Sequence, residues 1–214
     1  MTTSVFIIYY NSKANGGSFT QYLKEDTRIR IISVALEEFS DKGYLDTSMR
    51  DIARNAGISI GNIYRYFKNK SDLFNEIIEP AYNRLLLEMG ETSYSMTDYS
   101  VSLIENNIDS IMKVLKQYKK QLVILIDKSN GTKYEGTKEE SIQYLESRLK
   151  EMLMPVLNEK GVKVHDPFVF YLLSSSFMDG FFTILRTYDD PAKIRYLARE
   201  LIVLIFGNID ERFA

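Results

Sequence analysis

The chain has 214 residues, of which 45% are hydrophobic and 26% are charged, so it can bury a substantial core and is neither disordered nor fibrous. Its 27 Lys and Arg stand against 29 Asp and Glu, and this balance excludes general coating of nucleic acid but not a local basic face. No cysteine and one histidine are present, which excludes disulfides, thiolate metal sites and cysteine nucleophiles, so we expect no metal and no cofactor.

The first 17 residues are poorly patterned and end in the flexible sequence Asn15-Gly16-Gly17, so residues 1–17 are interpreted as an N-terminal arm. The apolar run from Val5 to Tyr10 is too short to span a membrane and lacks the basic start of a signal peptide. No later segment reaches membrane length without charges. We therefore expect a cytoplasmic protein that does not contact a membrane.

From about residue 18 to residue 207 the apolar residues recur with helical spacing, and no strand pattern of useful length appears. The first helix is predicted to stop at Gly43, and a polar linker is predicted at 90–98. The other predicted helices cover 48–55, 59–67, 71–89, a stripe over 101–115, a separate helix around 122–126, 138–160 with a kink at Pro155, 167–187 and 191–207. The expected fold class is all-α, with a three-helix helix-turn-helix domain at 18–75 and a helical domain at 76–214.

The helix-turn-helix prediction rests on the stretch from Thr47 to Lys70. Thr47 or Ser48 can cap the first helix, and Ser48 followed by Asp51 has the form of a capping box. Gly57 permits the positive φ of a tight turn between helices. Ser59 is placed to cap the second helix, and the small Ala53 allows the two helices to cross closely.

The same spacing turns Ile58 and Ile63 inward and leaves an outward face made of Ile60, Gly61, Asn62, Tyr64 and Arg65. Phe67 shares the inward face, and Arg54 is interpreted as a solvated surface charge. No acidic residue lies between Asp51 and Asp72, whereas the segment carries Arg54, Arg65, Lys68 and Lys70. The local charge is therefore opposite to that of the whole chain, on the element predicted to enter a DNA major groove.

The run from Arg30 to Phe74 resembles the DNA-binding domain of the TetR family of transcriptional regulators. The matching segments are Ala35-Leu-Glu-Glu-Phe39, Lys42-Gly-Tyr44, Thr47-Ser48, Asp51-Ile-Ala53, Ala56-Gly-Ile-Ser59 and Gly61-Asn-Ile-Tyr-Arg-Tyr-Phe-Lys-Asn-Lys70. The resemblance implies a homodimer on near-palindromic double-stranded operator DNA. It places Thr47, Ser48, Tyr64, Tyr66 and Lys70 on phosphates, and Ser59, Ile60, Gly61, Asn62 and Arg65 over base edges.

Two positions depart from the family pattern. Ile60 stands where a lysine is common, which favours an apolar contact such as one to a thymine methyl group. Asn62 replaces a small hydroxyl residue, and its amide is suited to bidentate recognition of adenine.

The last two predicted helices are apolar on more than one face, and in this family such a pair forms a four-helix interface with its mate. The expected interface residues are Phe170, Leu173, Phe177, Phe181, Leu197, Leu201, Leu204 and Ile205, and Ser174 to Ser176 with Gly180 would let helices approach closely. The alternative is a monomeric core.

The resemblance also implies a ligand site in the C-terminal domain, with Met112, Tyr118, Tyr144, Met152 and Phe177 as candidate lining residues. Tyrosine and methionine content favours a small apolar or aromatic effector. From the family we expect a repressor that is released from its operator when the helix at about 71–89 moves. Two other hypotheses stay open. One is an interaction protein whose helix-turn-helix packs on a partner protein. The other is a helical enzyme acting on an apolar substrate, for which the sequence offers no catalytic arrangement. The lone His165 is interpreted as a surface loop residue.

Overall fold

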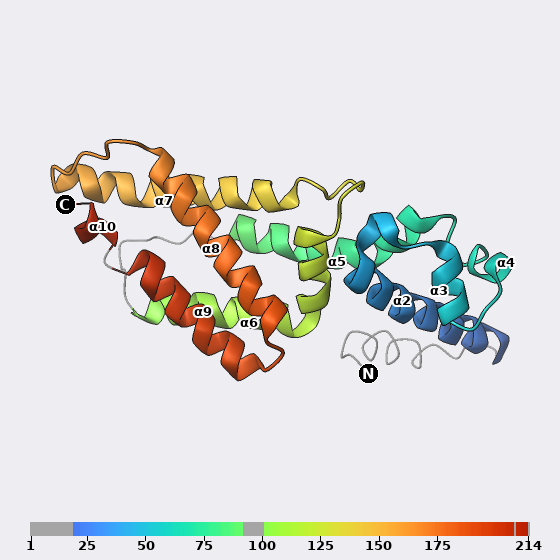
Figure 1. Cartoon of the computed structure of the whole chain (residues 1–214). Helices are drawn as coiled ribbons and strands as arrows, with labels where there is room; N and C mark the ends of the chain where they lie inside the picture. The colour runs from blue at the N-terminus through green and yellow to red at the C-terminus, as the bar shows by residue number, and fades with distance from the viewer. Residues whose placement is uncertain (1–18, 92–100, 208, 214) are drawn as a thin grey trace. The chain divides into compact units, whose positions relative to one another are not determined.

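The computed structural model describes residues 19–91, 101–207 and 209–213. The predicted arm at 1–17 and most of the predicted linker at 90–98 lie outside these residues. Every regular element within the described ranges is a helix, which confirms the all-α class (Figure 1). The helices group into two compact units.

The first unit contains residues up to Leu86 together with 117–135. Its helices are α2 (Phe19–Asp46), α3 (Met49–Asn55), α4 (Ile60–Ile63), the first part of α5 (Lys70–Glu91) and the end of α6 (Val101–Asp127). Its core includes fully buried aromatic side chains, namely Phe39, Phe67, Phe74 and Tyr134. Phe74 makes edge contacts with Phe39 and Tyr44, so α5 is packed firmly against α2 and the turn after it.

Gly43 interrupts α2 as predicted. Its φ of 79° and ψ of 174° are not helical, and the chain bends there although helical turns resume as far as Asp46. A side chain at this position would be strained at positive φ, which explains the glycine.

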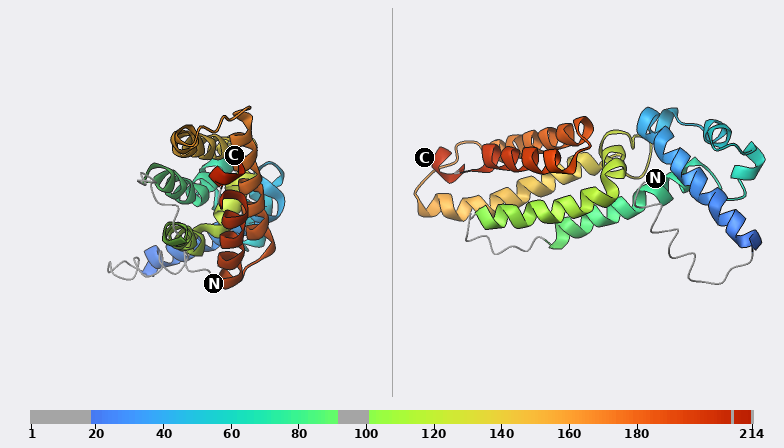
Figure 2. Two further views of the ribbon diagram at one scale, coloured as in Figure 1. Left: turned by 90° about the vertical axis from the view of Figure 1, so that its left-hand side faces the viewer. Right: turned by 90° about the horizontal axis from the view of Figure 1, so that it is seen from below.

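The second unit contains residues 87–116 and 136–214. It holds the first part of α6, then α7 (Thr137–Glu159), α8 (Phe168–Thr187), α9 (Pro191–Phe206) and the short α10 (Ile209–Arg212). Within this unit α8 contacts both α7 and α9, and the three helices lie side by side (Figure 2). The buried cluster consists of Leu149, Leu153, Leu157, Phe170 and Ile209.

The division into units differs from the predicted boundary at residue 75. Helix α5 is continuous past that point, and the units separate only after Leu86. The segment 117–135, expected in the C-terminal domain, clusters with the helix-turn-helix. Where the sequence indicated a break between 115 and 122, α6 is one continuous helix, and α10 was not predicted.

Helix α8 is long and apolar enough to cross a membrane, judged by length and composition alone. It carries two charged residues, Asp179 and Arg186, and packs on α7 and α9. A core helix of a soluble protein passes the same test, so we interpret α8 as a packing helix.

Candidate nucleic-acid interface

Helix α3 begins at the predicted cap. The Asp51 backbone N–H donates to Ser48 Oγ at 3.1 Å, and the Ser48 hydroxyl donates to Asp51 Oδ2 at 2.7 Å. This differs from a standard capping box, in which the acidic side chain accepts from the backbone N–H of the cap residue. The hydrogen bond from Ser48, with Arg54 as a weaker contributor, lowers the pKa of Asp51, so this carboxylate stays charged at neutral pH.

The turn and the second helix are also as predicted. Gly57 has a φ of 66°, and Ser59 Oγ accepts from the Asn62 backbone N–H at 3.2 Å. Helix α4 covers only residues 60–63, and single-turn hydrogen bonds continue the winding from Arg65 N to Asn62 O and from Tyr66 N to Ile63 O. The predicted helix at 59–67 is therefore one α-helical turn followed by tighter turns.

Burial divides this segment into an inner and an outer face. Ile63 and Phe67 are fully buried, which confirms the prediction that both pack inward. On the outer side Ile60 is 44% exposed and Tyr64 51% exposed, and Gly61 and Arg65 are exposed as well. Asn62 and Tyr66 are half-buried at its edge. Seven of the ten predicted DNA-contacting residues thus share this turn and its surroundings, and five of the seven, including Ser59, are exposed.

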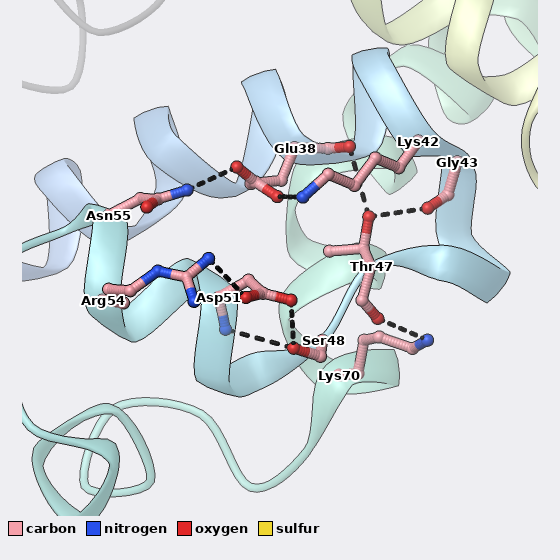
Figure 3. A network of polar contacts seen from close by, with 9 residues as sticks. All are labelled: Glu38, Lys42, Gly43, Thr47, Ser48, Asp51, Arg54, Asn55 and Lys70. Carbon is pink, nitrogen blue, oxygen red and sulfur yellow. Dashed lines mark hydrogen bonds and ion pairs between the residues drawn. The ribbon is translucent and has the colours of Figure 1, made fainter.

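Thr47 lies next to the Ser48 cap of α3 and turns inward. It is 2% exposed, and its hydroxyl donates to Gly43 O at 2.7 Å and to Glu38 O at 3.2 Å (Figure 3). The hydroxyl is committed to the end of α2, so in this conformation its contribution is to join α2 to α3 and not to reach a phosphate.

Lys70 also points into the protein. Its ammonium donates to the backbone carbonyls of Tyr44, Leu45 and Thr47. Burial lowers the pKa of this ammonium, and the nearby Asp46 acts in the opposite direction.

A polar network holds α3 on α2 (Figure 3). Glu38 accepts from Asn55 Nδ2 at 2.6 Å and pairs with Lys42 at 2.7 Å. Arg54 pairs with Asp51 at 2.6 Å, in agreement with its interpretation as a surface charge. Of these contacts only the hydrogen bond from Asn55 to Glu38 joins α3 to α2, and it helps to set how the two helices cross.

Several exposed cations lie on or next to α3 and α4. Arg65 and Lys68 are exposed, and so is Arg50 in the first turn of α3, which the sequence reasoning did not single out. Its position beside the Ser48 cap was a usable signal, since the first turn of such a helix faces the DNA backbone in helix-turn-helix proteins.

The predicted interface residues on α8 and α9 differ in burial. Leu204 is 68% exposed, whereas Phe170 is fully buried in the core with Leu149 and Leu153. Phe170 is therefore covered by residues of its own chain. Phe181, Leu173, Leu197, Leu201 and Ile205 are partly buried, and Gly180 lies directly under Leu201, to which a Cβ would come within 3.0 Å. The exposed apolar residues that the sequence reasoning missed here are Phe168, Leu172, Tyr196 and Val203.

The candidate ligand residues do not all fall in one unit. Tyr118 belongs to the first unit, and Met112, Tyr144, Met152 and Phe177 to the second. Met152 packs against the Leu149–Leu153 core, and the Phe177 ring lies 5.3 Å from that of Phe206. All five side chains are partly buried. Among the described residues no group of three or more His, Cys, Asp or Glu side chains is arranged to hold a metal.

Known proteins resemble this chain both in the helix-turn-helix region alone and over a larger part of its length. The family described as bacterial regulatory proteins, tetR family, matches residues 31–77. The uncharacterized HTH-type transcriptional regulator YhgD of Bacillus subtilis is 30% identical over 147 residues, which are 66% of this chain and 75% of that protein. The HTH-type transcriptional regulator AcrR of Shigella flexneri is 48% identical over 60 residues, so the match spans only 28% of each chain.

The fold has solved counterparts. A member of the TetR transcriptional regulator family from Streptomyces coelicolor A3 superposes with a TM-score of 0.62 at 21% identity, over 83% of this chain and 89% of that one. The fold and the capped, outward-facing α4 define a helix-turn-helix DNA-binding regulator. With the match to YhgD they show that this chain belongs to the TetR family of transcriptional regulators, a family of DNA-binding proteins and not of enzymes.

Proposed function

We propose that this protein is a cytoplasmic repressor that binds a near-palindromic operator as a homodimer and leaves it when a small apolar or aromatic molecule binds. The observation that carries the proposal is the outer face of α4, where Ile60, Tyr64 and Arg65 are exposed above a fully buried Ile63. The inner side of this turn is firmly packed, yet an isoleucine and a tyrosine are exposed on its outer side. Contact with a binding partner best explains these two exposed side chains.

Each side chain of the face is suited to one part of DNA. Arg65 can donate to a phosphate or to guanine, and Asn62 to the adenine edge. Ile60 offers an apolar contact to a thymine methyl. Ser48 and Ser59, at the starts of α3 and α4, and the hydroxyls of Tyr64 and Tyr66 supply phosphate contacts.

The apolar surface of α8 and α9 supports the dimer. These two helices pack on each other and carry five exposed apolar or aromatic side chains, namely Phe168, Leu172, Tyr196, Val203 and Leu204. Burying this surface against a second copy removes it from water, at about 25 cal/mol for each Å² of apolar area. Two copies would present two recognition turns, as two half-sites require.

Release by an effector is supported by the course of two helices. Helix α5 continues from the first unit into the second at Leu86, and α6 returns from the second into the first at Gln117. The chain passes between the units a third time after Glu135, so a molecule bound among the partly buried residues of the second unit has three covalent connections to the DNA-binding unit, two of them helical. The effector must prefer the form in which the two recognition turns no longer fit grooves about 34–36 Å apart, with a coupling of about 1–3 kcal/mol.

The proposal is tested by selection from a random double-stranded DNA library. We expect enrichment of an inverted repeat whose half-sites are centred about 10 base pairs apart, with two protomers on each duplex. Enrichment of no sequence, or of a single half-site by a monomer, would contradict the proposal. Small apolar and aromatic molecules that raise the melting temperature are then added to the complex, and an effector is expected to lower the affinity for the selected duplex.

A further inference from the structure

The ammonium of Lys70 is completely engaged by the backbone around the end of α2. It donates to Tyr44 O at 2.6 Å, to Thr47 O at 2.8 Å and to Leu45 O at 3.2 Å. It also lies 4.3 Å from the centroid of the Tyr44 ring. An ammonium has three N–H donors and no acceptor, so each of its donors already has a carbonyl partner.

The carbonyls that it contacts need a partner of this kind. Gly43 takes α2 out of helical geometry, so the carbonyls that follow are not paired by a regular helix. The C-terminal end of a helix also carries partial negative charge, which favours a cation. Hydrogen bonds from the ammonium to three carbonyls favour its charged form and so oppose the effect of burial.

The segment that Lys70 holds leads directly into the DNA-binding surface. Thr47, whose carbonyl it binds, fixes the other side of the turn through its hydroxyl on Gly43 O, and it immediately precedes Ser48, the cap of α3 (Figure 3). The turn is thus held by the side chain of Thr47, which belongs to the turn, and by the side chain of Lys70, which comes from α5. The direction of α3, and with it of α4, depends on this turn.

We propose that Lys70 is a positioning residue that sets the α2–α3 turn through three backbone carbonyls and does not itself bind a DNA phosphate. This inference rests on the proposed DNA-binding function, and it replaces the phosphate contact that the family resemblance implies. Lys68, two residues earlier and exposed, is the matched lysine whose ammonium no other described residue is seen to engage.

The first experiment uses the unaltered protein. Lysine acetylation by a limiting amine-reactive reagent is followed by mass spectrometry, with and without a mixed-sequence duplex of about 30 base pairs, roughly three helical turns. Lys70 is expected to react at least about tenfold more slowly than Lys68 in the free protein, and equally slowly with DNA, because its ammonium is already engaged. A Lys70 as reactive as Lys68 in the free protein, and protected only by DNA, would overturn the proposal.

The second experiment compares Lys70→Met, Lys70→Arg and the control Lys68→Met. Arginine binds phosphates at least as well as lysine, but its planar fork does not match three carbonyls arranged around one nitrogen. We expect both Lys70 variants to bind the duplex about tenfold more weakly, and backbone amides 49–51 to exchange faster with deuterium. The salt dependence of binding should be the same in Lys70→Met as in the unaltered protein.

Two results would contradict the proposal. One is full DNA affinity in Lys70→Arg; the other is Lys70→Met with unchanged amide exchange and a log–log salt slope smaller by about one than that of the unaltered protein. The reactivity measurement needs no variant, so it decides the assignment even where a substitution prevents folding. If the unaltered protein binds no duplex, the proposed function fails, whereas Lys70 reactivity and amide exchange in the free protein still test the positioning role.

Discussion

The outer face of α4 combines an isoleucine, an asparagine and an arginine where each has a different use. Arg65 supplies charge, and Ile60 and Asn62 supply contacts that depend on the base they meet. Asn62 is anchored by its backbone N–H to Ser59 Oγ, so its side chain projects from a fixed point. Affinity and sequence preference are therefore expected to separate between residues of one turn.

Replacement of Asn62 by alanine tests that separation. Asn62→Ala is expected to relax preference at one base position in each half-site, by about 1–3 kcal/mol, because a bidentate contact to adenine is lost. The slope of affinity against salt should not change, since the amide is neutral. Competition between the selected duplex and its single-base variants measures both, and an undiminished preference at every position would show that Asn62 reads no base.

The Ser48–Asp51 pair gives a prediction about pH. The pKa of Asp51 is lowered in the folded protein, first by the hydrogen bond from Ser48 and then by Arg54. A carboxyl with a lowered folded pKa contributes stability that is present above its unfolded pKa of about 4 and is lost as the pH falls through the folded value.

We therefore expect Asp51→Asn to be less stable than the unaltered protein at pH 7, and the difference to shrink as the pH is lowered below about 4. Urea unfolding at a series of pH values gives the comparison, with Asp41→Asn, an exposed aspartate of α2, as control. A difference that is constant across the series would mean that the carboxylate charge contributes nothing.

At the scale of elements, the end of α6 and the loop after it form part of the DNA-binding unit. Lys128 donates to Ser40 O and to Asp41 O at 3.0 Å, and its own carbonyl accepts from Tyr44 N at 3.0 Å. Lys120 pairs with Glu37 at 2.7 Å, and Lys133 with Glu79 at 3.1 Å. The end of α2 is thus held by one lysine from α5 and another from the end of α6.

Lys128→Met is expected to destabilise the first unit by about 1 kcal/mol, a value below that of a buried charged hydrogen bond because Lys128 is partly exposed. Thermal unfolding measures the change, and Lys116→Met, at an exposed lysine of α6, is the control. Equal melting temperatures for the two variants would show that the Lys128 contacts do not stabilise the unit.

The helix-turn-helix could be predicted in detail from the sequence, because its signals are local. Ser48, Gly57 and Ser59 act on residues within four positions of themselves, and the structure confirms all three. The continuity of α6 was missed because polar residues between 115 and 122 interrupt its apolar stripe. One of them, Lys120, pairs with Glu37, which is 83 positions away and cannot be found from spacing. Four-residue α10 is too short to show a period.

The same limit applies within the candidate site. The residue types at Thr47 and Lys70 suit a phosphate equally well, and only the fold shows that their polar atoms meet the carbonyls at the end of α2. Phe170 could not be separated from Phe168 by pattern either. Helical spacing shows that a helix is apolar on several faces but not which face its own chain covers.

At the scale of the whole molecule, the exposed apolar residues of α8 and α9 predict how the protein assembles. Leu204→Glu is expected to convert a dimer into monomers at micromolar concentration, because a carboxylate would be buried in the interface without a partner. Light scattering during size-exclusion chromatography measures the mass. Leu86→Glu, the same change at an exposed leucine of α5, should leave the dimer intact. A Leu204→Glu protein that remains dimeric would place the interface elsewhere.

The central claim is that α4 and its surroundings bind DNA through contacts that neutralise phosphates. The most direct measurement is the affinity for a mixed-sequence duplex of about 30 base pairs as a function of salt, for the unaltered protein and for Arg65→Ala, with the surface variant Arg54→Ala as control. We predict a steep linear fall of log affinity with log salt, and a slope smaller by about one in Arg65→Ala alone. Affinity that does not change with salt, or a slope that Arg65→Ala leaves as it was, would contradict the account.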